Sequence, residues 1–176
     1  TGGLGVEYGD KMSSALDITY REPEAFEGSV TGSLMGFSVA VGQSSRKFSQ
    51  LHGVRFKKNT SLLSSLETKG EYDPKFFDYQ TNLNWKISPK FKASFLGNIA
   101  VNNYKFQPVD RETNFGTSSD AKQFKVFFDG MEKDRFETYF GALNLTYKHS
   151  RSTDFSLIAS GYLTNELVSY DISGEY

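Results

Sequence analysis

Hydrophobic and polar positions alternate along much of this chain, most clearly between Phe76 and Phe106. Successive side chains on a strand point to opposite faces, so this alternation predicts strands with one apolar face and one polar face. A tight turn at Ser88-Pro89-Lys90 divides the stretch into two antiparallel strands. Its apolar face carries Phe77, Tyr79, Thr81, Leu83, Trp85 and Ile87, then Phe91, Ala93, Phe95, Gly97, Ile99 and Val101.

The length of these alternations distinguishes a soluble sheet from a transmembrane barrel wall. Strands of soluble sheets average about 5–6 residues. The two predicted strands alternate for roughly twice that length, and a tilted strand crosses a bilayer in about 9–11 residues. We therefore interpret the hairpin as part of a transmembrane β-barrel wall.

The same pattern predicts further strands on both sides of this hairpin. They cover residues 26–34, 37–42, about 48–58, 138–149 and 155–164. Together these segments predict an all-β protein, built as an antiparallel meander that forms part of a transmembrane β-barrel wall.

The connections between the predicted strands alternate in length. The short ones are 43–47, 88–90 and 150–153, and the long ones are 59–75 and 107–137. Outer-membrane barrels have short periplasmic turns and longer extracellular loops. Within the longest connection, Asp129-Gly130 lies between two apolar runs, which predicts a two-residue hairpin turn. For residues 59–75, one helical turn and a strand extension both remain open.

Residues 1–25 differ from the rest of the chain. Short alternating runs at 4–8 and 15–20 are followed by Arg21-Glu22-Pro23-Glu24, and proline cannot donate to a strand ladder. This predicts a small element and a linker, with the barrel strands in residues 26–176. Because the chain begins without Met or a signal peptide and stops in mid-pattern, we expect a piece of a larger protein.

The amino-acid composition excludes some classes of function and agrees with a barrel wall. The 176 residues include no cysteine, which excludes a disulfide framework and a cysteine metal site. The net charge of −1, with scattered charges, argues against nucleic-acid binding. Mean hydropathy is −0.48, but barrel strands place every second residue on a polar interior. The aromatic content of 15% suits strands with aromatic girdles.

The chain contains few candidates for chemistry. His52 and His149 lie on separate predicted strands without a partner motif, and Asp110, Glu112 and Asp120 miss the spacing of a calcium loop. A basic cluster that could meet an anionic ligand consists of Arg46, Lys47, Arg55, Lys57 and Lys58. We expect no enzyme, and we assign no catalytic, cofactor-binding or metal-binding residue.

Three segments resemble TonB-dependent outer-membrane receptors of the Bacteroidetes type. Residues 8–18, YGDKMSSALDI, resemble the end of the plug domain of that family, with Asp10 where a second glycine is usual. Residues 72–86 and 95–108 resemble strands of its barrel. The resemblance implies that residues 1–25 end a plug and that residues 26–176 form about seven strands of a 22-stranded barrel in the bacterial outer membrane.

The resemblance also implies partners and a function. Such receptors bind a scarce nutrient and import it with energy delivered by TonB, and a lipoprotein partner is possible. Outer-membrane lipid would surround the wall, no nucleic acid is expected, and an isolated fragment would self-associate through open sheet edges. The alternative is a soluble cell-surface β-sandwich or barrel that binds a glycan or peptide, in which Trp85, Phe95 and Leu143 would meet in one core.

Overall fold

The computed structural model describes residues 18–59, 70–117 and 120–175 of the chain. These residues form nine β-strands and no helix. The strands are β1 (Glu27–Ser33), β2 (Gly36–Ser44), β3 (Phe48–Lys58), β4 (Gly70–Tyr72), β5 (Lys75–Ser88), β6 (Phe91–Pro108), β7 (Arg111–Thr117), β8 (Asp120–Lys148) and β9 (Asp154–Glu175).

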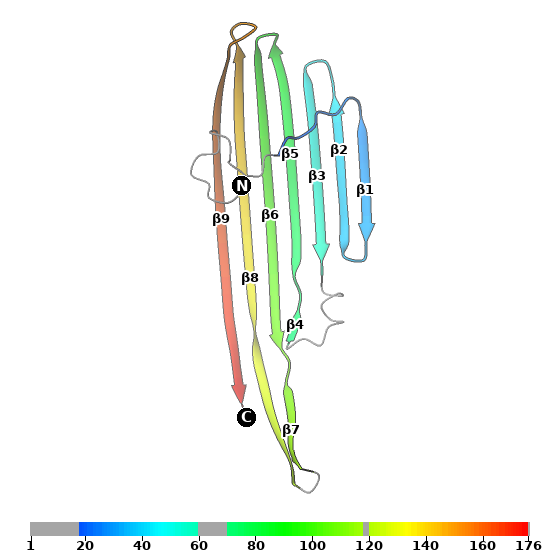
Figure 1. The fold of residues 1–176 in the computed structure, drawn as a ribbon, viewed down its shortest axis with the longest axis vertical. Helices are drawn as coiled ribbons and strands as arrows, with labels where there is room; N and C mark the ends of the chain where they lie inside the picture. The colour runs from blue at the N-terminus through cyan, green and yellow to red at the C-terminus, as the bar shows by residue number, and fades with distance from the viewer. Residues whose placement is uncertain (1–17, 60–69, 118–119, 176) are drawn as a thin grey trace, which may run out of the picture.

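All nine strands belong to one antiparallel sheet (Figure 1). Seven of them form a meander in the order β1-β2-β3-β5-β6-β8-β9, while β4 pairs with the end of β6 and β7 with the beginning of β8. Among the described residues, β1 and β9 are the two edges, so the sheet is open. The prediction of an all-β antiparallel meander is confirmed.

The predicted central hairpin is also confirmed. Strand β5 ends at Ser88 and β6 begins at Phe91, with the Ser88 hydroxyl accepting the Lys90 N–H at 3.3 Å. This turn, the β2–β3 connection and the β8–β9 connection lie at the same end of the sheet, called the turn end. Strands β4 and β7 lie at the opposite end, called the β7 end (Figure 1).

The predicted hairpin turn at Asp129-Gly130 is wrong. Both residues lie inside β8, which is 29 residues long, and the β7–β8 turn instead joins Thr117 to Asp120. Gly130 has the positive φ of 91° that suits a turn, but it stays paired with Ile172 of β9. Most of the predicted loop 107–137 is therefore strand, because β8 pairs with β7 up to Val126 and with β9 from Phe127 onward.

Two further predictions fall partly outside the described residues. The segment 8–18 that resembles the end of a plug lies outside the described part of the chain except for Ile18, and so does the center of the long connection, residues 60–69. Residues 18–26 are irregular, so the strand predicted over 15–20 is not formed at 18–20. Strand β4 at 70–72 agrees with the strand extension that the sequence left open.

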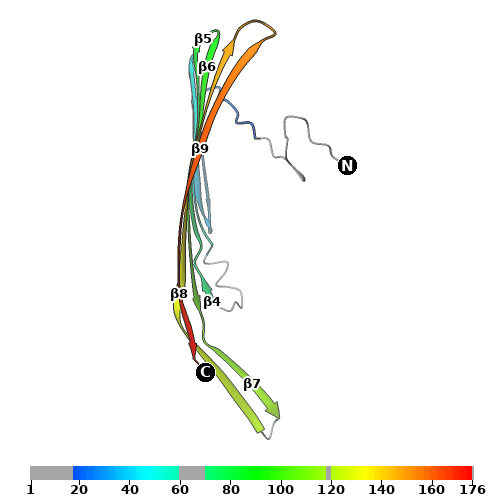
Figure 2. The same cartoon turned by 90° about the vertical axis from the view of Figure 1, so that its left-hand side faces the viewer.

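The sheet is a single curved layer (Figure 2). No hydrophobic side chain among the described residues is buried, so this part of the chain has no core. None of the described residues forms a helix that is long and apolar enough to cross a membrane. The side chains of the described strands therefore lie on one or the other face of a single sheet.

Candidate functional site

The strand register brings apolar positions from neighbouring strands to one side of the sheet, called the apolar face. Residues paired across antiparallel strands point to the same side. Phe95 pairs with Leu83 on β5 and with Leu143 on β8, for example. The large members of the apolar face are Val30, Phe37, Val39, Val41, Phe48, Val54, Phe56, Phe77, Tyr79, Leu83, Trp85, Phe91, Phe95, Ile99, Val101, Tyr139, Leu143, Leu145, Tyr147, Phe155, Leu157 and Leu163.

The apolar face has no second layer packed against it in the described structure. The exposed fraction is 54% for Trp85, 39% for Phe95 and 41% for Leu143. Soluble monomers rarely expose contiguous apolar patches larger than a few hundred Å². This face therefore needs an apolar cover that the described residues do not supply.

The apolar face forms a band of limited height. On β6 it runs from Phe91 to Val101, and on β8 the apolar stretch runs from Tyr147 to Tyr139, two residues short of the partner of Val101. At about 3.4 Å per residue the β6 stretch is about 34 Å long. At a strand tilt of about 40° its height would be about 26 Å, close to the apolar band of about 25 Å in outer-membrane barrels.

Charged side chains end the band toward the β7 end. The next residue on this face of β8 is Glu137, whose Oε1 accepts a hydrogen bond from Arg135 Nε at 2.7 Å. The Asn165 amide and the Tyr139 hydroxyl donate to its other oxygen at 3.5 Å and 3.2 Å. The hydrogen bond from Arg135, above all, holds the pKa of Glu137 below its ordinary value. The border is therefore marked by an ionised carboxylate.

Aromatic side chains gather at both limits of the band. Phe91, Tyr147 and Phe155 are paired in one row near the turn end. Tyr79 and Tyr139 lie in one row on the far side of the band, with one residue of β6 between them. Aromatic rings with polar groups favour the depth where a membrane meets water, so the two rows have the arrangement of two girdles.

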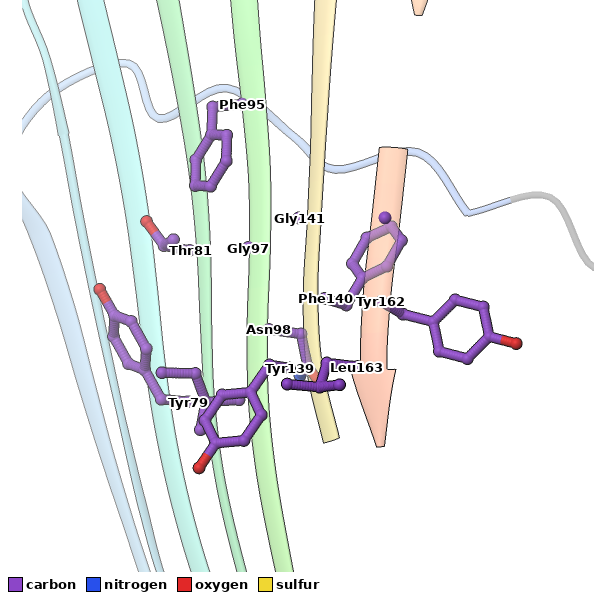
Figure 3. Close-up of a pocket in the computed structure, with 12 residues that line it drawn as sticks. Tyr79, Thr81, Phe95, Gly97, Asn98, Tyr139, Phe140, Gly141, Tyr162 and Leu163 are labelled. Atoms are coloured by element: carbon purple, nitrogen blue, oxygen red, sulfur yellow. The ribbon is translucent and has the colours of Figure 1, made fainter. Parts of the chain in front are cut away.

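A shallow groove of about 480 Å³ crosses the apolar face within the band (Figure 3). Its floor is one row of paired residues, Thr81, Gly97, Gly141 and Gly161. Phe95 borders the groove on one side and Tyr79, Tyr139 and Leu163 on the other. The Phe95 ring covers the floor so closely that a Cβ added at Gly97 would lie 2.9 Å from it. The apolar lining suits a hydrocarbon chain.

His52 interrupts the apolar face on β3. Its Nδ1 lies 2.9 Å from the Tyr79 hydroxyl and 3.1 Å from Thr81 Oγ1, and its Nε2 lies 3.3 Å from Gln50 Oε1. Sequence reasoning gave His52 no partner because Tyr79 and Thr81 are 27 and 29 residues away. The pairing of β3 with β5 brings these groups together, and they satisfy one another's hydrogen bonds.

The opposite side of the same strands is called the polar face. Its most buried charge is Asp78, 6% exposed, which accepts two hydrogen bonds from the Arg55 guanidinium. The guanidinium carbon also lies 4.8 Å from the center of the Phe76 ring. An ion pair with an aromatic contact on one side is a structural clamp between β3 and β5.

The basic cluster expected from the sequence is divided by the structure. Arg55 and Lys57 lie on the polar face, whereas Lys58 lies on the opposite side of β3. Arg46 and Lys47 lie in the β2–β3 connection, at the other end of that strand. These five residues therefore do not form one surface for an anionic ligand.

The irregular segment 18–26 lies against the polar face. The Tyr20 hydroxyl donates to Gln80 Oε1 at 3.2 Å, and the Glu22 carboxylate lies 3.6 Å from Lys86 Nζ. Figure 2 shows this segment on the concave side of the curved sheet. The polar face is therefore concave and the apolar face convex, which is the curvature of a barrel wall with a polar interior.

Two of the acidic residues considered for calcium have partners within the protein. Asp110 Oδ1 accepts the Phe128 N–H at 2.9 Å, and Glu112 pairs with Lys125 at 3.3 Å. The side chain of Asp120 lies outside the described part. In the part of the chain that the structure describes, no three histidine, aspartate or glutamate side chains are grouped to hold a metal ion.

Comparison of the chain with protein-family models, curated proteins and solved structures found no match.

Proposed function

We propose that this chain forms part of the wall of a receptor in the bacterial outer membrane. The observation that carries the proposal is the band on the apolar face, which continues across the seven strands of the meander. Its estimated height of about 26 Å, its aromatic borders and its charged limit at Glu137 match what a bilayer requires of a barrel wall. The convex apolar face contacts lipid, and the concave polar face lines the lumen.

The transport function follows from the resemblance to TonB-dependent receptors. In this proposal residues 1–25 end the plug and residues 26–176 are the first strands of a 22-stranded barrel. The receptor binds a scarce nutrient and imports it with energy delivered by TonB. The contacts from Tyr20 to Gln80 and from Glu22 to Lys86 support the proposal, because a segment that leaves a plug has to lie on the lumen side of the wall.

The soluble β-sandwich agrees less well with the structure. A sandwich would bury Trp85, Phe95 and Leu143 between two sheets, whereas all three are exposed on the one sheet described. The open edges also need an explanation, because unpaired strand edges invite association. We propose that neighbouring strands of the parent barrel pair with β1 and β9, and that an isolated fragment self-associates through these edges.

A pair of neighbouring cysteines tests the proposal. The chain has no cysteine, so Leu143→Cys on the apolar face and Asn144→Cys on the polar face can be labelled without background. In lipid vesicles we expect Cys at 143 to react with a lipid-soluble maleimide and to resist a charged one that stays in water. Cys at 144 should react with the charged reagent.

The ratio of the two reagents is taken at each cysteine separately, so differences in expression between the two variants cancel. Equal reaction of both cysteines with the charged maleimide would show that water covers both faces, and would contradict the proposal. Labelling of the unfolded chain in denaturant gives the full intrinsic reactivity of each cysteine.

A further inference from the structure

Both faces of the sheet change in composition beyond the band, where the convex side also keeps Met131 and Leu167. On β8 the side that carries Tyr139 and Leu143 continues with Arg135 and Lys133. The polar-face side continues instead with a group of aromatic residues from four strands. This aromatic patch consists of Tyr72, Tyr104, Phe106, Phe136 and Tyr170.

Three rings of the aromatic patch are direct neighbours. The ring centers of Tyr72 and Phe106 are 4.8 Å apart, and those of Tyr72 and Tyr104 are 6.2 Å apart. Tyr170 is 68% exposed on the β9 side of the patch. Aromatic rings that meet water on the concave side of the sheet offer their faces to a ligand.

The charges around the aromatic patch have one sign. Glu132 pairs with Phe106, Asp134 with Tyr104 and Glu166 with Phe136, so all three carboxylates share the side of the patch. On this side, the described residues of β4, β6 from Asn102, β8 from 128 to 136 and β9 from 166 include no lysine or arginine. The basic residues of the same strands lie on the convex side, at Lys105, Lys133 and Arg135.

One carboxylate oxygen beside the patch lacks a hydrogen-bond partner among the described residues. Asp134 Oδ1 is shielded from solvent and has no hydrogen-bond partner among the described residues. A shielded carboxylate oxygen without a donor is costly. Burial, first, and then the nearby Tyr72, Glu132 and Asp134 raise the pKa of Tyr104, so the field at the patch already opposes a further negative charge.

We propose that the aromatic patch and its carboxylates form a binding site for an organic cation with an apolar body. A positive charge over an aromatic face is attracted by the ring, and this attraction strengthens where water is excluded. Asp134 and Glu132 supply the counter-charge, and the rings cover the apolar part of the ligand. The inference relies on the proposed function only for placing the site at the lumen mouth, outside the lipid.

Anions and neutral sugars fit this surface less well. An anion would meet the three carboxylates without a cationic side chain on the same stretch of the face, since Arg111 and Lys122 lie farther out on the β7–β8 hairpin. A neutral sugar can stack on the rings, but it leaves the charge of the carboxylates unbalanced. Charge complementarity therefore favours the cation.

Equilibrium binding to the purified protein in detergent micelles tests the site. The probes are benzyltrimethylammonium, benzenesulfonate as an anion of similar size, and maltopentaose as a neutral sugar. We expect the cation to bind at least about tenfold more tightly than either of the others, as cation–π attraction and charge pairing imply. Tighter binding of the anion or the sugar, or no saturable binding of the cation, would overturn the proposal.

Matched variants locate the site. Asp134→Asn should weaken cation binding about tenfold, whereas Asp171→Asn, on the convex side of β9, should leave it unchanged. Tyr72→Leu should weaken binding and Tyr72→Phe should retain it, because only the ring is required. Equal effects of Asp134→Asn and Asp171→Asn would contradict the site, and the cysteine labelling at 143 and 144 separately reports whether the wall itself lies in lipid.

Discussion

The same strands carry different side chains on each face in their two halves. Near the turn end, β6 and β8 have aliphatic and aromatic side chains on the convex face and amides on the concave face, as Phe95 and Asn98 illustrate. Near the β7 end, lysine and arginine lie on the convex face and aromatic rings on the concave face, as Lys105 and Phe106 illustrate. Backbone pairing continues through both halves without a register shift between β6 and β8.

This difference indicates that the surroundings, rather than the backbone, change along the strands. A soluble sheet with one covered face would keep its apolar side on that face over its whole length. A strand that leaves a bilayer loses the need for apolar side chains on its outer side and gains water there. The border at Glu137 is where we expect the surroundings to change.

The largest expected effect is that of a charge within the band. Leu143→Arg should lower the free energy of unfolding in lipid by about 2–4 kcal/mol, the cost of arginine near the bilayer midplane. Ser169→Arg lies on the same face beyond the band and should change it by less than about 1 kcal/mol. Denaturant unfolding in vesicles measures the change in unfolding free energy for both variants. Equal changes would show that the convex face has the same surroundings in the two halves.

The next effect concerns two glycines, one in each half. Gly130 has a φ of 91°, and an added Cβ would clash with the Asp171 carbonyl oxygen. Gly130→Ala should cost about 1–3 kcal/mol through backbone strain. Gly161→Ala places its Cβ in open space and should change stability by less than about 0.5 kcal/mol. Thermal unfolding of the two variants compares them, and a harmless Gly130→Ala would contradict the local conformation.

A smaller effect is expected for the ion pairs of β3. Asp78→Asn weakens the bonds to Arg55 and should cost about 1–2 kcal/mol, because a half-exposed Arg55 (side chain 45% exposed) recovers some solvation. Lys58→Met removes a contact of 3.8 Å to Asp73 and should cost less than about 0.5 kcal/mol. If the denaturant midpoints shift equally for the two variants, the Arg55–Asp78 pair stabilises the sheet no more than the exposed Lys58–Asp73 contact does.

The smallest effect is a pH dependence in the β7–β8 hairpin. Glu112 is exposed, and a hydrogen bond from Lys125, first, and others from Gln123 and Asn114 lower its pKa. The pKa of Glu112 in the folded hairpin lies below its value in the unfolded chain. Its hydrogen bonds therefore stabilise the hairpin above the unfolded pKa, and this stabilisation is lost as the pH falls through the folded pKa.

Amide hydrogen exchange of the hairpin, measured from neutral to acidic pH, checks this contribution. Because the intrinsic exchange rate of amides itself falls with acidification, exchange is expressed as a protection factor. The protection of the hairpin should fall as Glu112 becomes protonated, and Glu112→Gln should abolish that fall. An unchanged profile in Glu112→Gln would show that another group titrates.

The strands within the band could be predicted from the sequence because their alternation has one phase. From Phe91 to Val101 the apolar residues of β6 occupy odd positions except for Leu96 and Ala100, and that regularity identified both the strand and its apolar face. The phase then changes, with Tyr104 and Phe106 at even positions. A change of phase resembles the end of a strand, so residues 107–137 were interpreted as a loop although β8 pairs with β9 throughout the region from 127.

The polar contacts could not be predicted for a different reason. The hydrogen bond between His52 and Tyr79 depends on the register of β3 against β5, and a shift of one residue would send the two side chains to opposite faces. Asp129-Gly130 has the residues of a hairpin turn, but pairing with distant residues of β9 overrides that local preference. The binding site proposed at the β7 end likewise depends on four strands meeting.

The most direct test of the central claim uses Trp85, the only tryptophan of the chain. Trp85 lies on the apolar face toward the turn end of the band and is 54% exposed. In vesicles, its fluorescence should be quenched by brominated lipids, more strongly with bromine near the headgroups than near the chain ends, and should resist iodide in the water. Quenching by iodide with no effect of the brominated lipids would place the apolar face in water and contradict the membrane wall.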